Sequence, residues 1–287
     1  MSPAAARHPE PTAPLEERAR RLADVLAALG SVCVGYSGGV DSAYLAVAAV
    51  DALGAANVLA VTGLSPAYPG VQRAMALEVA ERFGVPQCEI TTDELADPRY
   101  AANPTDRCYF CKTELWARLR AVADERGLAT VVDGANADDA ADYRPGARAA
   151  REHGVRSPLQ EVGLTKANVR ALSRARGLPT WDQPAAPCLA SRLPYGLSVT
   201  PARLAQVEAA EDALRALGLR EFRVRHHGDV ARLEVAPAER PVALARAAEL
   251  AAGIRAAGFA RALLDADGYR RGALNEGLPL VTLEGGT

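Results

Sequence analysis

The chain has 287 residues and a formal net charge of −2 at pH 7. This length suits two domains of ordinary size. The near-balanced charge argues against nucleic-acid binding driven by bulk charge, although a local basic patch stays open. Five cysteines are an odd number in a chain without a signal peptide or an apolar run of membrane length, which predicts thiols or ligands in a reducing cytoplasm rather than disulfides.

The first part of the chain alternates between short apolar runs and helical runs. Residues 1–14 are rich in Pro and Ala without periodicity and are predicted to be a disordered tail. Strands are then predicted at 31–36, 58–63, 87–91 and 129–133, and helices at 15–29, 40–53, 71–83 and 112–126. This rhythm predicts an α/β domain over residues 15–180, a parallel sheet with helices on both faces.

The rhythm changes in a Pro-rich stretch from Pro179 to Pro187, after a helix predicted at 166–176 with Thr165 as its N-cap. A helix is predicted at 201–217, and strands at 221–225 and 230–235 are joined by His226, His227, Gly228 and Asp229. A helix at 240–257 and a strand at 261–265 follow. Residues 181–287 are therefore predicted to form a smaller C-terminal α+β domain.

A loop of small residues links the first predicted strand to the second helix. Its adjacent glycines let the backbone approach an anion without a Cβ clash, and the following helix presents unpaired N–H groups and its positive dipole end. The loop therefore suits a pyrophosphate, held by Ser37, Gly38, Gly39, Val40, Asp41 and Ser42. It is not a Walker loop, because no Lys follows the glycines. The alternative is a plain strand-to-helix turn rich in small residues.

A polar cluster follows the fourth predicted strand and shares the sheet edge with this loop. Its carboxylates fit magnesium binding, or hydrogen bonds from ribose and substrate hydroxyls. We expect Asp133, Gly134 and Asn136 at the nucleotide, and Asp41 with Asp138 at Mg²⁺. The alternative is helix capping by Asp138 and Asp139.

Three cysteines form the third candidate group. Cys108 and Cys111 make a C-x-x-C, and Cys188 lies far downstream. A C-x-x-C alone is compatible with zinc, redox chemistry or an iron–sulfur cluster, and a structural zinc would want a fourth ligand. Three cysteines without a fourth protein ligand fit a [4Fe–4S] cluster with one open iron. Cys33 and Cys88 are interpreted as core thiols.

Several segments together resemble the LarE family of ATP-dependent sulfur transferases. The loop at 37–42 is shared by the whole PP-loop ATP pyrophosphatase superfamily, whereas the block Cys-Leu-Ala-Ser-Arg at 188–192 is far more discriminating. The resemblance runs from about residue 15 to the C-terminus, through segments 37–42, 103–112, 133–146, 157–159, 163–166, 181–196, 224–235 and 268–276. It implies a PP-loop domain of the adenine nucleotide alpha hydrolase-like fold, followed by a C-terminal sulfur-transfer and substrate domain.

The resemblance also implies an activity. LarE enzymes adenylate the carboxylates of pyridinium-3,5-biscarboxylic acid mononucleotide with release of pyrophosphate. The carboxylates become thiocarboxylates for the nickel-pincer cofactor of lactate racemase. One form of the family gives up the sulfur of a single cysteine, which matches Cys188 and is left as dehydroalanine. The other form adds a C-x-x-C, and its three cysteines are thought to carry a [4Fe–4S] cluster. This chain has the second pattern, so Cys188, Cys108 and Cys111 are the expected catalytic residues.

The anionic substrate implies a cationic site, and Arg suits it because its planar fork binds phosphate or carboxylate bidentately. The candidates are Arg192, Arg223, Arg225 and Arg270, with Arg271 beside it. The competing explanation is that these arginines solvate strand ends. His226 and His227 either bind phosphate or pack in the hairpin turn. The resemblance implies a homo-oligomer, a hexamer. The net charge and the lack of an apolar run of membrane length predict no nucleic-acid or membrane partner.

Other classes stay open. PP-loop proteins include tRNA thiolases, which hold a cluster on three cysteines, and amidating ligases of the NAD and GMP synthetase type. A tRNA thiolase should carry a strongly basic surface or an RNA-binding domain. An amidating ligase would not need Cys188. A non-enzymatic ATP-binding regulator or scaffold would need neither Asp41 nor the cysteines.

Overall fold

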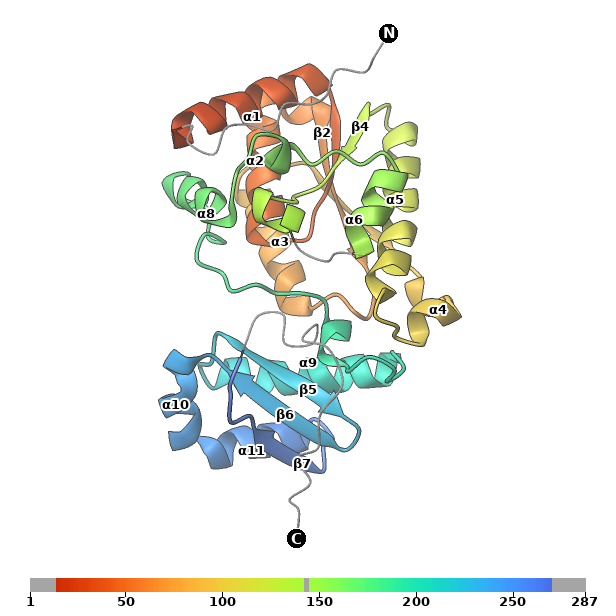
Figure 1. Cartoon of the computed structure of the whole chain (residues 1–287). Coiled ribbons are helices and arrows are strands. Elements are labelled where there is room, and N and C mark those ends of the chain that lie inside the picture. Colours follow the sequence, from red (N-terminus) through yellow and green to blue (C-terminus); the bar gives the residue numbers. More distant parts are fainter. Residues whose placement is uncertain (1–13, 142–144, 270–287) are drawn as a thin grey trace. The chain divides into compact units, whose positions relative to one another are not determined.

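A computed structural model describes residues 14–141 and 145–269, which divide into two units (Figure 1). The first unit runs to residue 189 and includes residues 198–201, and the second comprises 190–197 and the chain from 202. Of the predicted tail at 1–14, only Pro14 is among the described residues. The functional division at 180/181 stays a prediction.

The first unit is built on a parallel sheet, as the sequence predicts. Its strands are β1 (Val32–Gly35), β2 (Val58–Leu64), β3 (Gln87–Thr91) and β4 (Thr130–Val132), in the order β3-β2-β1-β4. Each strand is short and apolar, and β1 pairs in parallel with both β2 and β4. The carboxyl ends of all four strands therefore lie at one edge, where open α/β sheets bind ligands.

Helices cover both faces of this sheet, which confirms the predicted fold class (Figure 1). Alternation along β1 sends Val32 and Val34 into one core and Cys33 into the other. The helices of the first core are α1 (Leu15–Leu29), α2 (Val40–Leu53), α3 (Gly70–Arg82), α7 (Pro158–Glu161) and α8 (Lys166–Ala175). Those of the second are α5 (Arg107–Glu125) and α6 (Pro145–Glu152).

Short helical turns connect these elements and were not predicted. They are η1 (Ala55–Asn57), η2 (Glu94–Ala96), α4 (Pro98–Ala101), η3 (Ala137–Ala141) and η4 (Leu189–Arg192). Helix α5 also begins five positions before the predicted start at Lys112, so Cys108 and Cys111 lie in its first turns. Cys, Tyr and Phe are poor helix formers, so the sequence does not predict this extension of α5.

The second unit has a three-stranded sheet of β5 (Phe222–His227), β6 (Val230–Val235) and β7 (Arg261–Leu264). β5 and β6 are antiparallel, and β7 runs parallel to β6. Its helices are α9 (Pro201–Ala216), α10 (Arg240–Ala245) and α11 (Ala247–Ala256), with η5 (Pro237–Glu239) between β6 and α10. The single helix predicted at 240–257 is two helices, because Arg246 leaves the helical conformation with φ −109° and ψ 21°.

No helix within the described residues combines the length and the apolar composition that crossing a bilayer requires.

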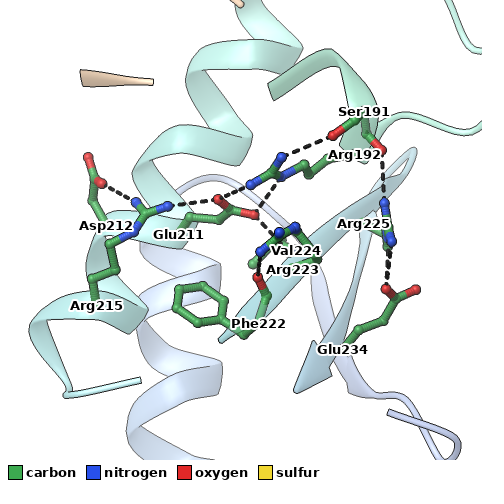
Figure 2. A network of polar contacts seen from close by, with 10 residues as sticks. All are labelled: Ser191, Arg192, Glu211, Asp212, Arg215, Phe222, Arg223, Val224, Arg225 and Glu234. Atoms are coloured by element: carbon green, nitrogen blue, oxygen red, sulfur yellow. Dashed lines mark hydrogen bonds and ion pairs between the residues drawn. The ribbon is translucent and has the colours of Figure 1, made fainter. Parts of the chain in front are cut away.

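Buried charges organise the second unit (Figure 2). Arg192 and Glu211 have side chains that are 1% and 0% exposed, and they form a bidentate pair with N···O distances of 2.8 and 2.9 Å. Glu211 also accepts hydrogen bonds from Arg215 and from the backbone of Val224. Arg225 pairs with the buried Glu234 and donates to the Ser191 carbonyl. Removing either member of such a pair would leave an uncompensated buried charge.

We therefore expect Glu211→Gln to destabilise the second unit by about 3–5 kcal/mol, because the Arg192 charge stays buried without its carboxylate. The matched control is Glu249→Gln, since Glu249 forms an exposed ion pair with Arg246 and its loss should change stability by less than about 1 kcal/mol. Urea unfolding of both variants measures the difference. Equal stabilities would show that the buried pair contributes little.

A low pH should remove part of the stability that ionised Glu211 contributes to the second unit. Burial acts to raise the pKa of Glu211, but Arg192 and Arg215 outweigh burial and hold this pKa below its usual value. A carboxyl whose pKa is lowered on folding adds stability above its unfolded value of about 4.3, and that stability is lost as the pH falls through the lower folded value. Stability below pH ~4 should therefore fall less steeply in Glu211→Gln than in the wild type.

Candidate functional site

The loop at 37–42 joins β1 to α2 at the carboxyl edge of the first sheet. Gly38 has φ +68°, and a Cβ there would lie 2.7 Å from the Gln72 carbonyl oxygen, so the position needs glycine. The Ser42 hydroxyl accepts from the backbone N–H of Ser37 at 3.2 Å and lies 3.1 Å from the Ser37 Oγ. Gly39, the N-cap of α2, offers no side-chain cap, so N–H groups of the first turn keep capacity for an anion.

The polar cluster after β4 reaches this loop through Gly134. A Cβ on Gly134 would lie 2.8 Å from the Ser42 nitrogen, so the two segments approach more closely than any side chain permits. Asp133 accepts hydrogen bonds from the Ser157 hydroxyl at 2.7 Å and from the Ala135 N–H at 3.1 Å. Burial raises the pKa of Asp133, and the Ser157 hydrogen bond opposes this. Asp133 and Gly134 thus lie beside the loop, as expected for strand ends of one edge.

Asn136 and the two following acids hold the turn after β4 together. Asn136 is 3% exposed, and its Oδ1 accepts from the Asp138 N–H at 3.0 Å. The Asp139 carboxylate accepts from the Asn136 N–H at 3.1 Å. These polar side chains therefore lie together, and they accept hydrogen bonds from nearby backbone N–H groups, as the capping alternative predicts in part.

Lys166, which the sequence analysis did not single out, pairs with Asp41. Its Nζ lies 2.6 Å from Asp41 Oδ2, and its backbone N–H donates to Asp138 Oδ2 at 2.9 Å. Burial raises the pKa of Asp41, and the charge of Lys166 opposes that shift. The only sequence signal was Thr165, whose capping box with Asn168 fixes where α8 begins and so places Lys166.

Asp41 and Asp138 were the predicted magnesium ligands. Asp41 Oδ1 is buried and has no hydrogen bond of ordinary geometry within the described residues, although the nearby Asn136 amide helps to lower the Asp41 pKa. This oxygen fits a hard cation, whereas Asp138 Oδ2 is already engaged by the Lys166 backbone. Across residues 14–141 and 145–269, no three Asp, Glu, His or Cys side chains are grouped to hold a single metal ion. Mg²⁺ in nucleotide sites takes most of its ligands from phosphate and water, so one carboxylate is enough to fit it.

The loop between β2 and α3 connects the loop at 37–42, called the nucleotide loop below, to the segment that contains Cys188. The Tyr68 hydroxyl donates to the Ser37 carbonyl at 3.1 Å. One residue earlier, the Ala67 carbonyl accepts from the backbone N–H of Leu189, the neighbour of Cys188, at 2.8 Å. The backbone next to Cys188 is therefore fixed within the first unit, two hydrogen bonds away from the loop at 37–42.

The three predicted cysteines lie within electrostatic range of one another. The pKa of Cys111 is raised by burial, then by Glu94, and further by Cys188 and Cys108. The Cys108 residue is exposed, but protein atoms surround its thiol, and its pKa is raised by burial and then by Cys188. Cys33, by contrast, is fully buried in the second core, where burial raises its pKa to about 12. Cys88 is half-buried on β3.

Arg107 brings a buried positive charge to these thiols and was not predicted. Its guanidinium donates to Asn103 Oδ1 at 2.5 Å, and its hydrogen bond and charge lower the pKa of Cys108 against the effect of burial. Cys188 also interacts electrostatically with Arg107. Thiols with a neighbouring cation are donors of the kind that a group bound through thiolates requires, but the three cysteines are not grouped to hold a single metal ion within the described residues, so the [4Fe–4S] cluster stays a prediction.

The second unit holds the predicted arginines in the network of Figure 2. Arg192 and Arg225 are paired with Glu211 and Glu234. Arg223 is 5% exposed, and its pKa is lowered to about 10 by burial and by the like charge of Arg192. Arg270 and Arg271 lie outside the described residues. Substrate binding by these arginines stays a prediction.

The two histidines differ. His226 is 3% exposed, its Nε2 lies 3.0 Å from Gln206 Oε1, and its ring packs edge-on against Phe259. His227 is exposed at the end of β5, followed by a two-residue turn to β6. His226 therefore packs within β5 and not in the hairpin turn, which consists of Gly228 and Asp229.

Known proteins resemble this chain over different lengths. The NAD synthase family matches residues 17–126. The pyridinium-3,5-bisthiocarboxylic acid mononucleotide synthase of Lactiplantibacillus plantarum is 37% identical over 94% of this chain and 98% of its own length. An uncharacterized protein of Synechocystis is 42% identical over 91% of this chain and 98% of its own length. An uncharacterized protein of Methanocaldococcus jannaschii is 26% identical over 71% of this chain and 77% of its own length.

We expect Gly134→Ala to destabilise the chain by about 1–3 kcal/mol, because its new Cβ would collide with the Ser42 backbone. The control is Gly39→Ala, whose Cβ would meet only Ser37 Oγ at 3.5 Å and Gln72 Nε2 at 3.6 Å, and which should change stability by less than about 1 kcal/mol. Thermal unfolding compares the two. Equal melting temperatures would contradict the close approach.

Proposed function

The chain belongs to the LarE family, and we propose that it is an ATP-dependent sulfur transferase that makes thiocarboxylates on a pyridinium dicarboxylate mononucleotide. The observation that carries this proposal is the proximity of the nucleotide loop and the Cys188 segment within one unit. Tyr68 holds the first and Ala67 the second, and they are adjacent residues. Activation of the carboxylate by ATP and delivery of sulfur would then take place at neighbouring parts of the same sheet edge.

In the first step, a substrate carboxylate oxygen attacks the α-phosphorus of ATP, and pyrophosphate leaves as the P–O bond to the β-phosphate breaks. A carboxylate resists a sulfur nucleophile, and adenylation removes its charge and supplies AMP as a leaving group. The N–H groups at the start of α2 and the hydroxyls of Ser37 and Ser42 would hold the pyrophosphate. Asp41 Oδ1 would bind Mg²⁺, and the charge of Lys166 opposes the rise that burial causes in the Asp41 pKa.

In the second step, sulfur attacks the acyl carbon and AMP leaves. If Cys188 is the donor, its thiolate forms a thioester with the substrate. Loss of the Cys188 α-proton then breaks the Cβ–S bond, which leaves a thiocarboxylate and dehydroalanine. If Cys108, Cys111 and Cys188 hold a [4Fe–4S] cluster, that cluster supplies sulfide, and the cysteine is not consumed. Arg107 supports either source, because a nearby positive charge favours thiolates.

The arginines of the second unit suit the anionic groups of this substrate. Arg192 and Arg225 have buried carboxylate partners. Arg223 donates to the Phe222 carbonyl and lies over the Tyr269 ring, and burial together with the like charges of Arg192 and Arg225 lowers its pKa. A bound phosphate would relieve that repulsion. We therefore propose Arg223 as the first of these candidates to test for phosphate binding.

A PP-loop tRNA thiolase and an amidating ligase are the alternatives. The NAD synthase match covers only the nucleotide-binding part at 17–126, which these classes share. The match to the L. plantarum synthase covers 94% of the chain and so extends far beyond the nucleotide-binding part, which favours thiocarboxylate formation.

Cys188→Ala should separate activation from sulfur transfer. We expect it to release pyrophosphate from ATP, Mg²⁺ and the dicarboxylate nucleotide, while thiocarboxylate formation falls by more than about 100-fold, because the reacting sulfur is gone. The matched control is Cys88→Ala, a half-buried thiol on β3 that should retain both activities. Release of pyrophosphate by the wild type and Cys188→Ala alike, with no thiocarboxylate from either, would point to an amidating ligase. Absence of pyrophosphate and thiocarboxylate from the wild type would overturn the proposal.

Anaerobic purification, an iron and sulfide assay, and intact mass before and after turnover distinguish the two sulfur sources. About four irons per chain and an unchanged mass are expected for delivery through a cluster. No iron, with a mass loss of one hydrogen sulfide, would assign Cys188 as a consumed reagent.

A further inference from the structure

The peptide unit between Ser37 and Gly38 lies just after β1, at the start of the nucleotide loop. Its carbonyl oxygen, on Ser37, accepts a hydrogen bond from the Tyr68 hydroxyl at 3.1 Å. Its N–H, on Gly38, makes no hydrogen bond within the described residues, although Gly38 is a buried residue. Buried backbone N–H groups nearly always have a partner in folded proteins. The Gly38 N–H is therefore available to a ligand of the loop.

The contact with Tyr68 sets the direction of this N–H. A peptide unit is planar and trans, so its C=O and N–H point in opposite directions. Because the Ser37 carbonyl is turned toward Tyr68, the Gly38 N–H points away from the phenol. A half-turn of the peptide would exchange the two groups and would direct a carbonyl oxygen where the N–H now points. Glycine adopts positive and negative φ with similar ease, so Gly38 by itself would not prevent that half-turn.

The neighbouring peptide units are held by other contacts. The Tyr36 carbonyl accepts from Thr62 Oγ1 of β2 at 2.9 Å. The Gly39 carbonyl accepts from the Ser42 hydroxyl at 3.2 Å. Without the Tyr68 hydroxyl, the peptide at the start of the loop would lose the hydrogen bond that the structure describes for it, while the peptides on either side kept theirs. The effect of Tyr68 is therefore confined to one peptide unit.

The fold directs the Tyr68 hydroxyl to this carbonyl. Tyr68 is half-buried, and its backbone N–H donates to the Ser65 carbonyl at 3.0 Å. Burial, and after it Glu89, raises the pKa of Tyr68, so its hydroxyl stays protonated and able to donate near pH 7. Glu89 does not compete strongly as an acceptor, because both of its carboxylate oxygens accept from Arg73, at 2.7 and 2.6 Å.

We propose that Tyr68 is a positioning residue for the pyrophosphate part of ATP, because its hydrogen bond to Ser37 keeps the Gly38 N–H turned toward the anion. Gly38 has φ +68°, and backbone of this kind directs successive N–H groups at one anion. The hydrogen bond disfavours the flipped peptide in the free protein, so that ATP meets a loop already in its binding conformation. This role rests on the proposed function only in taking ATP as the ligand of the loop.

Tyr68→Phe tests the proposal, because it removes the hydroxyl and keeps the ring. The matched control is Tyr36→Phe, whose hydroxyl also donates to a backbone carbonyl, that of Ala76 in α3 at 2.9 Å, which is not part of the loop. Isothermal titration calorimetry measures the binding of inorganic pyrophosphate with Mg²⁺, and of α,β-methylene-ATP, which cannot be cleaved between its α and β phosphates. Pyrophosphate release with the dicarboxylate nucleotide gives kcat and the KM for ATP separately.

We expect Tyr68→Phe to weaken the binding of both ligands about three- to fivefold, since one neutral hydrogen bond no longer opposes the flipped peptide. The KM for ATP should rise by a similar factor with kcat little changed, because the loop holds the phosphates in the ground state and in the transition state alike. Tyr36→Phe should bind both ligands like the wild type, although the loss of a buried hydrogen bond should lower its melting temperature.

The other outcomes are separable. Equal affinities of Tyr68→Phe and the wild type for both ligands would overturn the proposal. A loss confined to the ATP analogue would overturn it too, because the phenol would then contact the base or the ribose. The same holds if Tyr36→Phe loses as much affinity as Tyr68→Phe, since the effect would then be general loosening. If the wild type binds neither ligand, the proposed function fails together with this role. If it binds both but makes no thiocarboxylate, only the sulfur transfer fails.

Discussion

The ion pair between Asp41 and Lys166 joins parts of the chain that lie 125 positions apart, and the arrangement of the nucleotide loop depends on it. Lys166 binds Asp41 through its side chain and Asp138 through its backbone, so it connects the ends of β1 and β4 to the start of α8. Arg18 of α1 supports the same turn from outside, with hydrogen bonds to the Gly163 carbonyl and Asn168 Oδ1. Asp41 is half-buried, so this cation stabilises its negative charge, and the buried Oδ1 is left for another ligand.

Local patterns predicted most of the fold, whereas contacts between distant residues did not show in the sequence. The helix at 40–53 and the strand at 87–91 have the predicted bounds, because apolar period and glycine breaks are local signals. The cysteine group was predicted from resemblance, but Lys166 and Arg107 act through partners that only the folded chain brings near. His226 also needed the fold, since its placement in β5 against Phe259 depends on a turn of two residues rather than four.

The second unit shows why an arginine near a predicted substrate site cannot be assigned from sequence alone. Arg192 and Glu211 form a fully buried pair in which each charge compensates the other. Such a pair is weak evidence for stability as a whole, but loss of one partner is strongly destabilising. An Arg192 variant would therefore lose activity because it is destabilised, whether or not Arg192 binds the substrate. Arg223 is the more informative position, because like charges already oppose its protonated form.

Unsatisfied buried atoms point to a ligand only where a second feature marks the same place. The Ser173 and Thr180 hydroxyls are also buried without hydrogen bonds among the described residues, yet neither belongs to a motif of the candidate site. Asp41 Oδ1 lies in the loop at 37–42, beside the Lys166 ammonium. Such an atom costs about 1–3 kcal/mol in the free chain. A ligand that satisfies it would recover that energy on binding, so part of the stability of this protein should come from the group that binds there.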